Sequence, residues 1–103
     1  MAGRIIEGLA ESGLPARFDE HHIVERRNAA RFGREAIEDP RNKIYLPREF
    51  HWRVNGLYSS KQVQITGEGF RTVRQWMDTM SYEEQYLVGL KILEYLRTGV
   101  WPR

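Results

Sequence analysis

The sequence contains no cysteine, which removes several classes of site at once. Disulfide bonds, Cys-ligated zinc, iron–sulfur clusters and thiol nucleophiles are all excluded. Any metal site must therefore take its ligands from His, Asp, Glu, Asn or backbone oxygen.

Long apolar runs are absent as well. A helix that crosses a bilayer needs about 20 consecutive apolar residues, and no stretch of the chain approaches that length. The amino-terminal stretch MAGRIIEGLAESG is too polar for a secretory signal peptide. We therefore expect no membrane segment and no signal peptide in this chain.

A strong charge of one sign is the third thing that the sequence lacks. Its 16 basic and 14 acidic residues give a formal net charge of +2, although the sequence pI is about 9.2. The pI exaggerates a small imbalance in a nearly balanced chain. The net charge alone therefore supports nucleic-acid binding only weakly.

What the sequence does contain suits one small folded domain. The chain has 103 residues, of which 41% are hydrophobic and 12% aromatic. A chain of this length buries roughly two-thirds of its unfolded surface, which is enough for one modest core. We therefore expect a single domain over residues 1–103.

Hydrophobic spacing and turn signals predict short alternating elements in the first half of the chain. In chain order these are a helix within 4–12, a loop over 13–19, an extended run over 21–24, a helix over 25–37 and a turn over 39–42. Gly33 weakens the second helix by about 1 kcal/mol relative to alanine.

After the turn, an alternating strand is expected over 43–47, ending at Pro47. A short helix over 48–55 should follow, with Pro47 in its first turn and Gly56 as its stop. The stretch 57–66 is open between loop and strand.

Two helices should close the chain, the first over 70–80 and the second over 82–97. Ser81 and Glu84 have the spacing of a capping box at the start of the last helix. Its buried stripe is expected to contain Tyr86, Leu90, Leu93 and Leu96. The mixture of short strands and separate helices predicts an α+β fold.

The residues with the clearest chemistry are the histidines and two asparagines. His21 and His22 are adjacent, Asn42 precedes the strand over 43–47, and His51 lies on the helix that follows. Asn55 is four positions after His51 and therefore shares its helix face. Adjacent side chains on a regular strand point to opposite faces, so His21 and His22 need a strand start or a bend to serve one site.

This order of residues resembles the HNH motif of the ββα-metal nucleases. The local sequence is similar to that of the AHH-type nuclease domains found at the carboxyl ends of bacterial polymorphic toxins. The matching stretches are HHIV (21–24), DPRNKIYLP (39–47), His51, GLYSS (56–60) and EEQYLVGLKILEYLRTG (83–99). The sequence departs from the family's pattern at Glu20, where alanine is expected, and at Glu25, where proline is common.

The resemblance implies a small ββα-metal (HNH) core of two short strands and a helix, surrounded by further helices that include two at the carboxyl end. Carried over by position, His21 and His51 would be metal ligands and His22 the general base. Asn42 would bond to the loop backbone and keep His22 aimed. Asn55 is either a third metal ligand or only a helix cap before Gly56, and both interpretations stay open.

Phosphodiester hydrolysis is the chemistry that such a site would perform. The resemblance implies one divalent metal ion, and Mg²⁺, Zn²⁺, Ni²⁺ and Mn²⁺ all stay open. Histidine, with an ordinary pKa near 6.5, suits general-base work near neutral pH. Arg48, Arg53 and Lys61 are the best candidates for contacts to nucleic-acid phosphate. The arginines of 25–37 fit either a phosphate-facing surface or a solvated helix face.

By resemblance, then, the chain should be a metal-dependent endonuclease acting on DNA with little sequence specificity. The resemblance also implies a toxin domain that is secreted or delivered as part of a larger bacterial protein, acts in the target-cell cytoplasm and is neutralised by an immunity protein. A ribonuclease toxin on the same fold is one alternative. A non-catalytic module that binds metal or nucleic acid is the other.

Overall fold

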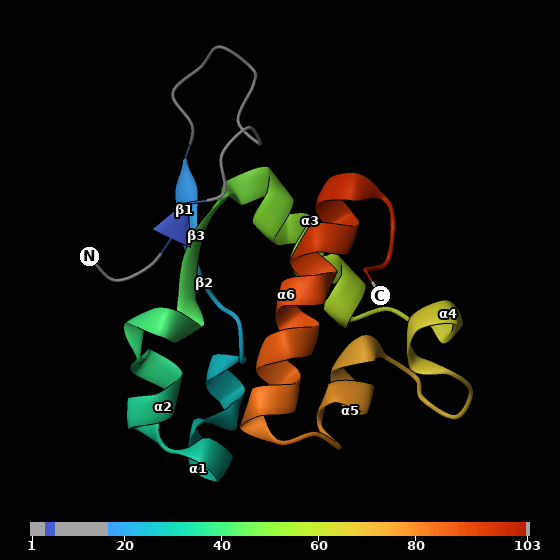
Figure 1. The fold of residues 1–103 in the computed structure, drawn as a ribbon, viewed down its shortest axis with the longest axis horizontal. Coiled ribbons are helices and arrows are strands. Elements are labelled where there is room, and N and C mark those ends of the chain that lie inside the picture. The colour runs from blue at the N-terminus through green and yellow to red at the C-terminus, as the bar shows by residue number, and fades with distance from the viewer. Residues whose placement is uncertain (1–3, 6–16, 103) are drawn as a thin grey trace. The chain divides into compact units, whose positions relative to one another are not determined.

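The structure is a computed structural model that describes residues 4–5 and 17–102 (Figure 1). Its contacts fall into two compact units, residues 1–51 and 52–103, and each unit is described here by itself. Short strands and helices are both present, so the predicted α+β class is confirmed. The single domain over 1–103 stays a prediction.

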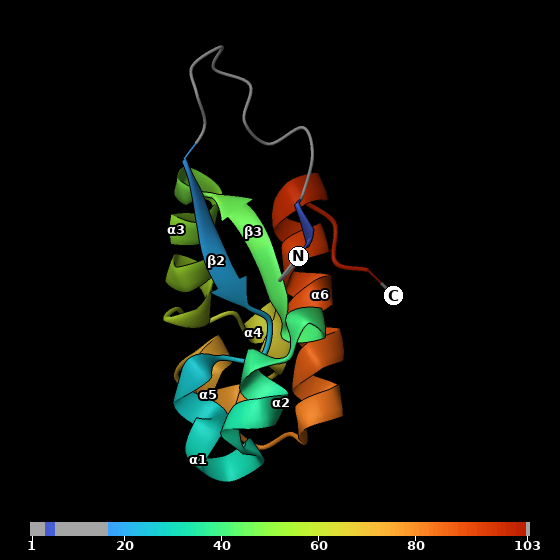
Figure 2. The same ribbon diagram turned by 90° about the vertical axis from the view of Figure 1, so that its left-hand side faces the viewer.

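The first unit contains a sheet of three strands in the order β1-β3-β2. The central strand β3 (Lys43–Pro47) pairs with β2 (Phe18–His22) in antiparallel orientation and with β1 (Arg4–Ile5) in parallel orientation. Figure 2 shows β2 and β3 side by side along their full length.

Alternation along the two longer strands gives the sheet an inner and an outer side. Ile44 and Leu46 of β3 are buried, and they pair with His21 and Asp19 of β2. Directly paired residues share a face of the sheet. The inner side therefore places Asp19 and His21 beside buried apolar residues, and the intervening residues Glu20 and His22 fall on the outer side.

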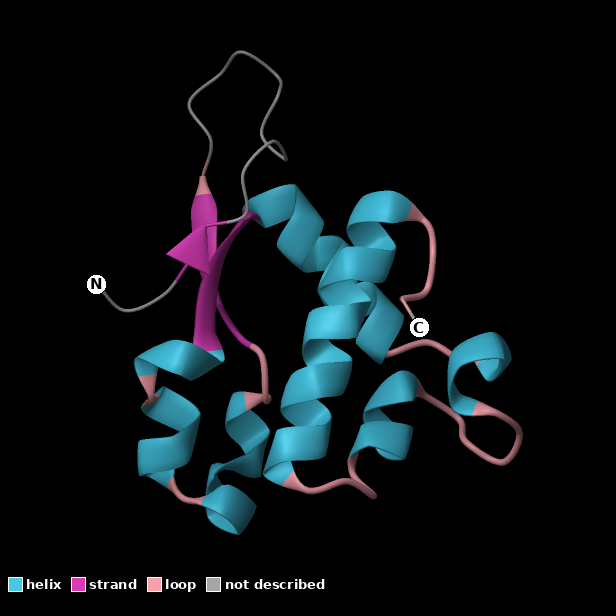
Figure 3. Cartoon of the chain, viewed as in Figure 1, coloured by secondary structure: helices cyan, strands magenta, loops and turns pink. Residues whose placement is uncertain are grey.

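A helical insertion joins the end of β2 to the start of β3 (Figure 3). Its elements are η1 (Arg26–Asn28), α1 (Ala29–Phe32), α2 (Arg34–Glu38) and η2 (Pro40–Asn42). Gly33 separates α1 from α2 with φ 89°, a conformation that glycine adopts without steric cost. Asp39 caps η2 by accepting a hydrogen bond from the Arg41 N–H at 2.9 Å.

Helix α3 (Arg48–Tyr58) begins directly after β3. The N–H of Arg48 donates to the carbonyl of Arg17 at 2.8 Å, which ties the start of α3 to the start of β2. Phe50 is buried in the first turn of the helix. The hydrogen bond of Arg48 and the burial of Phe50 orient the first turn of α3, and with it the side chain of His51.

The second unit contains the rest of α3 and three further helices. These are α4 (Val63–Thr66), α5 (Val73–Met77) and α6 (Tyr82–Thr98). The capping box predicted at α6 is formed, because Ser81 accepts from the Glu84 N–H and Glu84 accepts from the Ser81 N–H. Gly99 ends α6 in the left-handed region.

Three predicted elements are confirmed: the turn over 39–42, the strand over 43–47 and the helix over 82–97. The buried stripe of α6 was predicted correctly only at Leu93. Tyr86, Leu90 and Leu96 are half-buried, whereas the buried positions are Gln85, Gly89, Ile92 and Leu93.

Other predicted boundaries were wrong. Arg4–Ile5 is a strand because its backbone pairs with β3, and the rest of the helix expected within 4–12 lies outside the described residues. The loop over 13–19 fails at Phe18 and Asp19, which already belong to β2. The helix over 25–37 breaks at Gly33, and the helix over 70–80 shrinks to α5.

The stretch 57–66 was open between loop and strand, and it holds the end of α3 and all of α4. Helix α3 runs through Gly56 to Tyr58, so Gly56 is not a stop and Asn55 is not a helix cap. Pro47 is the last residue of β3. Over the residues that the structure describes, none of the helices has the length and apolar character that crossing a membrane requires.

Candidate metal and catalytic site

The first unit brings two of the three histidines together. The rings of His21, on the inner side of β2, and His51, in the first turn of α3, lie edge to face with centroids 5.2 Å apart. The two strands and the helix after them produce this meeting, because β3 delivers the chain to α3 beside the strand that contains His21. The histidines are 30 positions apart in the sequence.

Burial keeps the His21 ring neutral. Its pKa falls from 6.5 to about 3, mainly because burial disfavours the charged ring and further because His51 and His22 are nearby. A neutral imidazole is the form that binds metal ions. His21 is therefore in its ligand-competent form throughout the physiological range.

The ring of His51 is held from its other side by a carboxylate. Its Nδ1 lies 3.3 Å from Oδ2 of Asp19, whose Oδ1 lies 3.5 Å from Nε of Arg48. A metal-ligating histidine commonly places its second ring nitrogen on a carboxylate in this way. Arg48, predicted to contact phosphate, thus has an ion pair with Asp19.

The sequence reasoning missed Asp19 because it placed this residue in a loop. A signal was present: Asp19 is two residues before His21, and residues two apart on a strand share a face. Extending the strand back from His21 would have placed the carboxylate on the same side as the ring.

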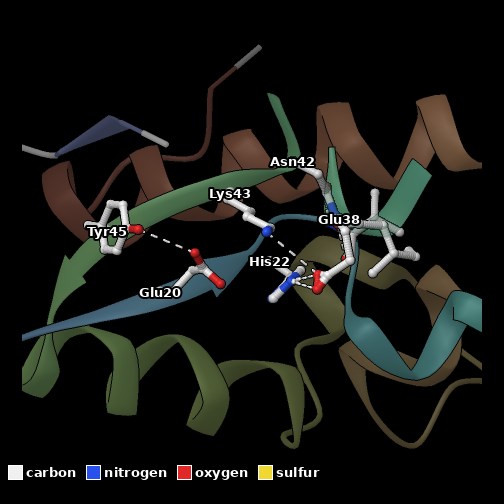
Figure 4. Close-up of polar contacts among 8 residues, drawn as sticks. Glu20, His22, Glu38, Asn42, Lys43 and Tyr45 are labelled. Atoms are coloured by element: carbon white, nitrogen blue, oxygen red, sulfur yellow. Dashed lines mark hydrogen bonds and ion pairs between the residues drawn. The ribbon is translucent and has the colours of Figure 1, made fainter. Parts of the chain in front are cut away.

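His22, the last residue of β2, contacts a different partner. Its Nε2 lies 3.0 Å from Oε2 and 3.3 Å from Oε1 of Glu38, at the end of α2. Lys43 approaches the same Oε2 to 3.7 Å (Figure 4). The pKa of Glu38 is lowered, chiefly by the hydrogen bond from His22. The sequence analysis gave Glu38 no role in the site.

Glu20 and Tyr45 form a separate contact on the same side of the sheet. The Tyr45 hydroxyl donates to Oε2 of Glu20 at 3.3 Å, and the two residues are paired in the register of β2 and β3 (Figure 4). Glu20 is therefore a carboxylate next to the site with a partner of its own.

Asn42 is fully buried and joins two segments of the insertion through its side chain. Its Oδ1 accepts from the Val24 N–H at 2.7 Å, and its Nδ2 donates to the carbonyls of Val24 at 3.0 Å and Ile37 at 2.9 Å. The resemblance implied bonds from Asn42 to the loop backbone, and the structure contains them. Val24 is two residues after His22, and Ile37 is the residue before Glu38.

Three predicted site residues belong to the second unit. Asn55 is exposed one helical turn beyond His51 on α3, and Lys61 is exposed between α3 and α4. Arg53 donates from Nη2 to the Leu96 carbonyl at 3.1 Å, so its guanidinium also has a structural contact with α6. The first unit brings His21 and His51 together and pairs Asp19 with both His51 and Arg48. His22, paired with Glu38, falls on the outer side of the sheet, and Asn42 bonds to Val24 and Ile37. Asn55, Arg53 and Lys61 stay predictions from the sequence.

The two imidazoles are suitable ligands for a divalent transition metal, but two ligands are too few to hold the ion alone. Within residues 4–5 and 17–102, no group of three or more His, Asp or Glu side chains is arranged to hold a metal ion. His21 and His51 supply two imidazoles, and imidazole suits Zn²⁺, Ni²⁺ and similar ions. A metal ion held by these two rings would need further ligands, and water or a substrate phosphate can supply them.

The arrangement as a whole offers one neutral imidazole, a second imidazole backed by a carboxylate, and a third histidine paired with another carboxylate. Such a set can provide both metal ligands and a general base. Comparison of the chain with models of protein families, with curated proteins and with solved structures finds no match.

Proposed function

We propose that this protein is a metal-dependent endonuclease with an HNH-type (ββα-metal) site that hydrolyses DNA with little sequence specificity. The observation that carries the proposal is the contact between His21 and His51, whose rings are 5.2 Å apart at the junction of β2, β3 and α3. Two antiparallel strands followed directly by a helix are the framework that the resemblance implies.

His21 and His51 are the residues that would hold one divalent metal ion, and Asn55 stays the third ligand predicted from the sequence. A bound metal ion supplies charge stabilisation to the phosphate and to the leaving oxygen. The chain's own contribution is to keep His21 neutral by burial and to orient His51 through Asp19.

His22 is the proposed general base, since it follows His21 where β2 ends and is held by Glu38 rather than by the proposed ligands. Asn42 is the proposed positioning residue, because its three backbone bonds fix the chain on both sides of the pair that His22 forms with Glu38. The roles thus divide between neighbouring residues of one strand.

Arg48 is the proposed phosphate contact in the first unit, and Arg53 and Lys61 are proposed in the second. All three would meet the backbone phosphate, which carries no sequence information, and this is why little sequence specificity is expected. The same contacts serve RNA, so DNA is preferred on the family resemblance alone.

The biological setting is proposed on that resemblance too. The chain would act as the toxin domain of a larger bacterial protein, be delivered into the cytoplasm of a target cell and be silenced there by a cognate immunity protein. An enzyme with little sequence specificity needs such an inhibitor in the producing cell, because its own genome is a substrate.

Purified protein incubated with supercoiled plasmid tests the proposal. Separate reactions contain Mg²⁺, Mn²⁺, Ni²⁺ or Zn²⁺, and a further reaction contains EDTA. We expect metal-dependent nicking that is lost in His22→Ala and kept in Glu35→Ala, a change at an exposed residue of α2. Equal cleavage by His22→Ala, or no cleavage by the wild type with any metal, would exclude the proposed enzyme. Parallel reactions with purified tRNA and rRNA separate a ribonuclease from a deoxyribonuclease.

A further inference from the structure

The contact between His22 and Glu38 determines which ring nitrogen of His22 holds the proton. Nε2 of His22 lies 3.0 and 3.3 Å from the two oxygens of Glu38. An ionised carboxylate only accepts hydrogen bonds, so Nε2 must be the donor. In the neutral ring, the lone pair is then on Nδ1.

The residues around this contact hold His22 and Glu38 in place. Asn42, which is fully buried, bonds to Val24 on the segment after His22 and to Ile37 on the segment before Glu38. One amide therefore clamps the two segments that bear the pair, although His22 and Glu38 are 16 positions apart.

The exposure of the two side chains and the nearby charge of Lys43 also support a fixed contact between His22 and an ionised Glu38. The side chain of His22 is only 9% exposed and that of Glu38 is 41% exposed, so the ring is held at the protein surface by a carboxylate that solvent reaches. Lys43, which pairs with His22 in the register of β2 and β3, lies 3.7 Å from the carboxylate oxygen nearest His22. The lysine favours the ionised, acceptor-only form of Glu38.

The geometry assigns to Glu38 the role of positioning residue for His22: it holds the Nε2–H tautomer and leaves Nδ1 as the basic atom. The catalytic consequence rests on the proposed nuclease function. The tautomer itself does not, because it follows from the hydrogen bond alone.

In the proposed reaction, Nδ1 of His22 takes a proton from the attacking water. The O–H bond of the water breaks as the N–H bond forms, the water oxygen bonds to phosphorus, and the bond from phosphorus to the leaving sugar oxygen breaks. That oxygen takes a proton from solvent. The ring becomes cationic during this transfer, and Glu38 stabilises the new charge through the Nε2–H bond, as carboxylates paired with catalytic histidines do.

The tautomer can be measured without any activity. Long-range ¹⁵N–¹H correlation spectra of the metal-free protein at about pH 8, above the ordinary pKa of histidine, distinguish Nε2–H from Nδ1–H rings. We expect His22 in the wild type to be the Nε2–H form. Glu38→Gln should keep this form, because the amide oxygen still accepts, whereas Glu38→Ala should give a mixture. Glu35→Ala, on the same short helix, should match the wild type.

Plasmid cleavage by the same variants tests the catalytic consequence. Glu38→Ala should lower kcat by about 10- to 100-fold with KM nearly unchanged, since general-base assistance is worth about 100-fold or more. Glu38→Gln should also lower kcat, because it keeps the tautomer but removes the charge. Adding Glu38→Ala to His22→Ala should have no further effect, because the glutamate acts through the ring.

The outcomes separate this inference from the proposed function. An Nδ1–H ring in the wild type, or an unchanged tautomer in Glu38→Ala, overturns the assignment of Glu38. A shifted tautomer with wild-type cleavage leaves Glu38 a structural partner and overturns its catalytic role. If the wild type cleaves no nucleic acid, the nuclease proposal fails, and the spectra still decide the positioning role.

Discussion

The side chain of Asn42 bonds to both backbone polar groups of Val24. Its Oδ1 accepts from the Val24 N–H at 2.7 Å and its Nδ2 donates to the Val24 carbonyl at 3.0 Å. The amide thereby pairs with Val24 as a strand neighbour would, at a point where the chain has left β2 and bends. It extends the order of the sheet past His22 without extending the strand.

Replacing Asn42 should destabilise the protein strongly. In Asn42→Ala, the N–H of Val24 and the carbonyls of Val24 and Ile37 lose their side-chain partner in a buried place. Leaving one buried polar group unpaired costs about 1–3 kcal/mol, so with three such groups we expect the free energy of unfolding to fall by about 3 kcal/mol or more. Urea denaturation measures it.

The matched control is Asn55→Ala. Asn55 is exposed inside α3, where alanine is the better helix former, so this variant should differ from the wild type by about 0.5 kcal/mol or less. Equal effects of the two substitutions would show that Asn42 does not clamp the insertion.

Local signals explain which parts of the fold could be predicted from the sequence. The turn at Asp39 and Pro40 and the capping box of Ser81 and Glu84 depend on residues at most three positions apart. The predicted helix end at Gly56 was wrong because a glycine inside a helix costs only about 1 kcal/mol. Burial of Val54, Leu57 and Tyr58 outweighs that cost.

The candidate site was predicted only in part, for the same reason. Its histidines and Asn42 were named through their order along the chain. The carboxylates were missed because their partners are distant: Asp19 is 32 positions from His51, and Glu38 is 16 positions from His22. Asp19 could have been found from the alternation of faces along a strand, since it is two residues before His21. The sequence contains no such signal for Glu38, because its position beside His22 depends on the break at Gly33 and the turn after it.

Removing the charge of Asp19 should weaken metal binding. In Asp19→Asn, the contact from Nδ1 of His51 loses its carboxylate, and loss of such a partner typically costs 10- to 100-fold in metal affinity. Calorimetric titration with Zn²⁺ or Ni²⁺ measures the change. Glu20→Gln is the control, because this adjacent carboxylate bonds to Tyr45 instead. An equal loss in both variants would point to net charge rather than to orientation of His51.

The buried ring of His21 should make stability depend on pH. Its pKa is about 3 in the folded protein and 6.5 in the unfolded chain, so between these values only the unfolded chain binds the proton. The free energy of unfolding must therefore fall as the pH is lowered through this window, by about 2 kcal/mol between about pH 7 and pH 5. Well above pH 6.5 both states are neutral and the contribution is constant.

Urea denaturation in EDTA at several pH values tests this dependence. His21→Gln lacks the titrating ring, so its stability should be flatter than that of the wild type between about pH 7 and pH 5, where carboxyl groups contribute little. Curves of the wild type and the variant that run parallel would mean that His21 accepts a proton in the folded protein.

Alanine at two exposed glycines should change stability in opposite directions. Gly33 has φ 89° between α1 and α2, whereas Gly56 lies inside α3, and no atom would crowd an added Cβ at either position. Only the backbone conformation matters at these positions. Gly33 combines φ 89° with ψ 146°, a region almost restricted to glycine, so Gly33→Ala should cost about 1–3 kcal/mol. Gly56→Ala should gain about 0.5–1 kcal/mol, since alanine favours the helix and restricts the unfolded chain. Thermal unfolding of the two variants beside the wild type measures both changes. If Gly33→Ala were stabilising, residues 25–37 would form one continuous helix. The break at Gly33 would then not be what places Glu38 beside His22.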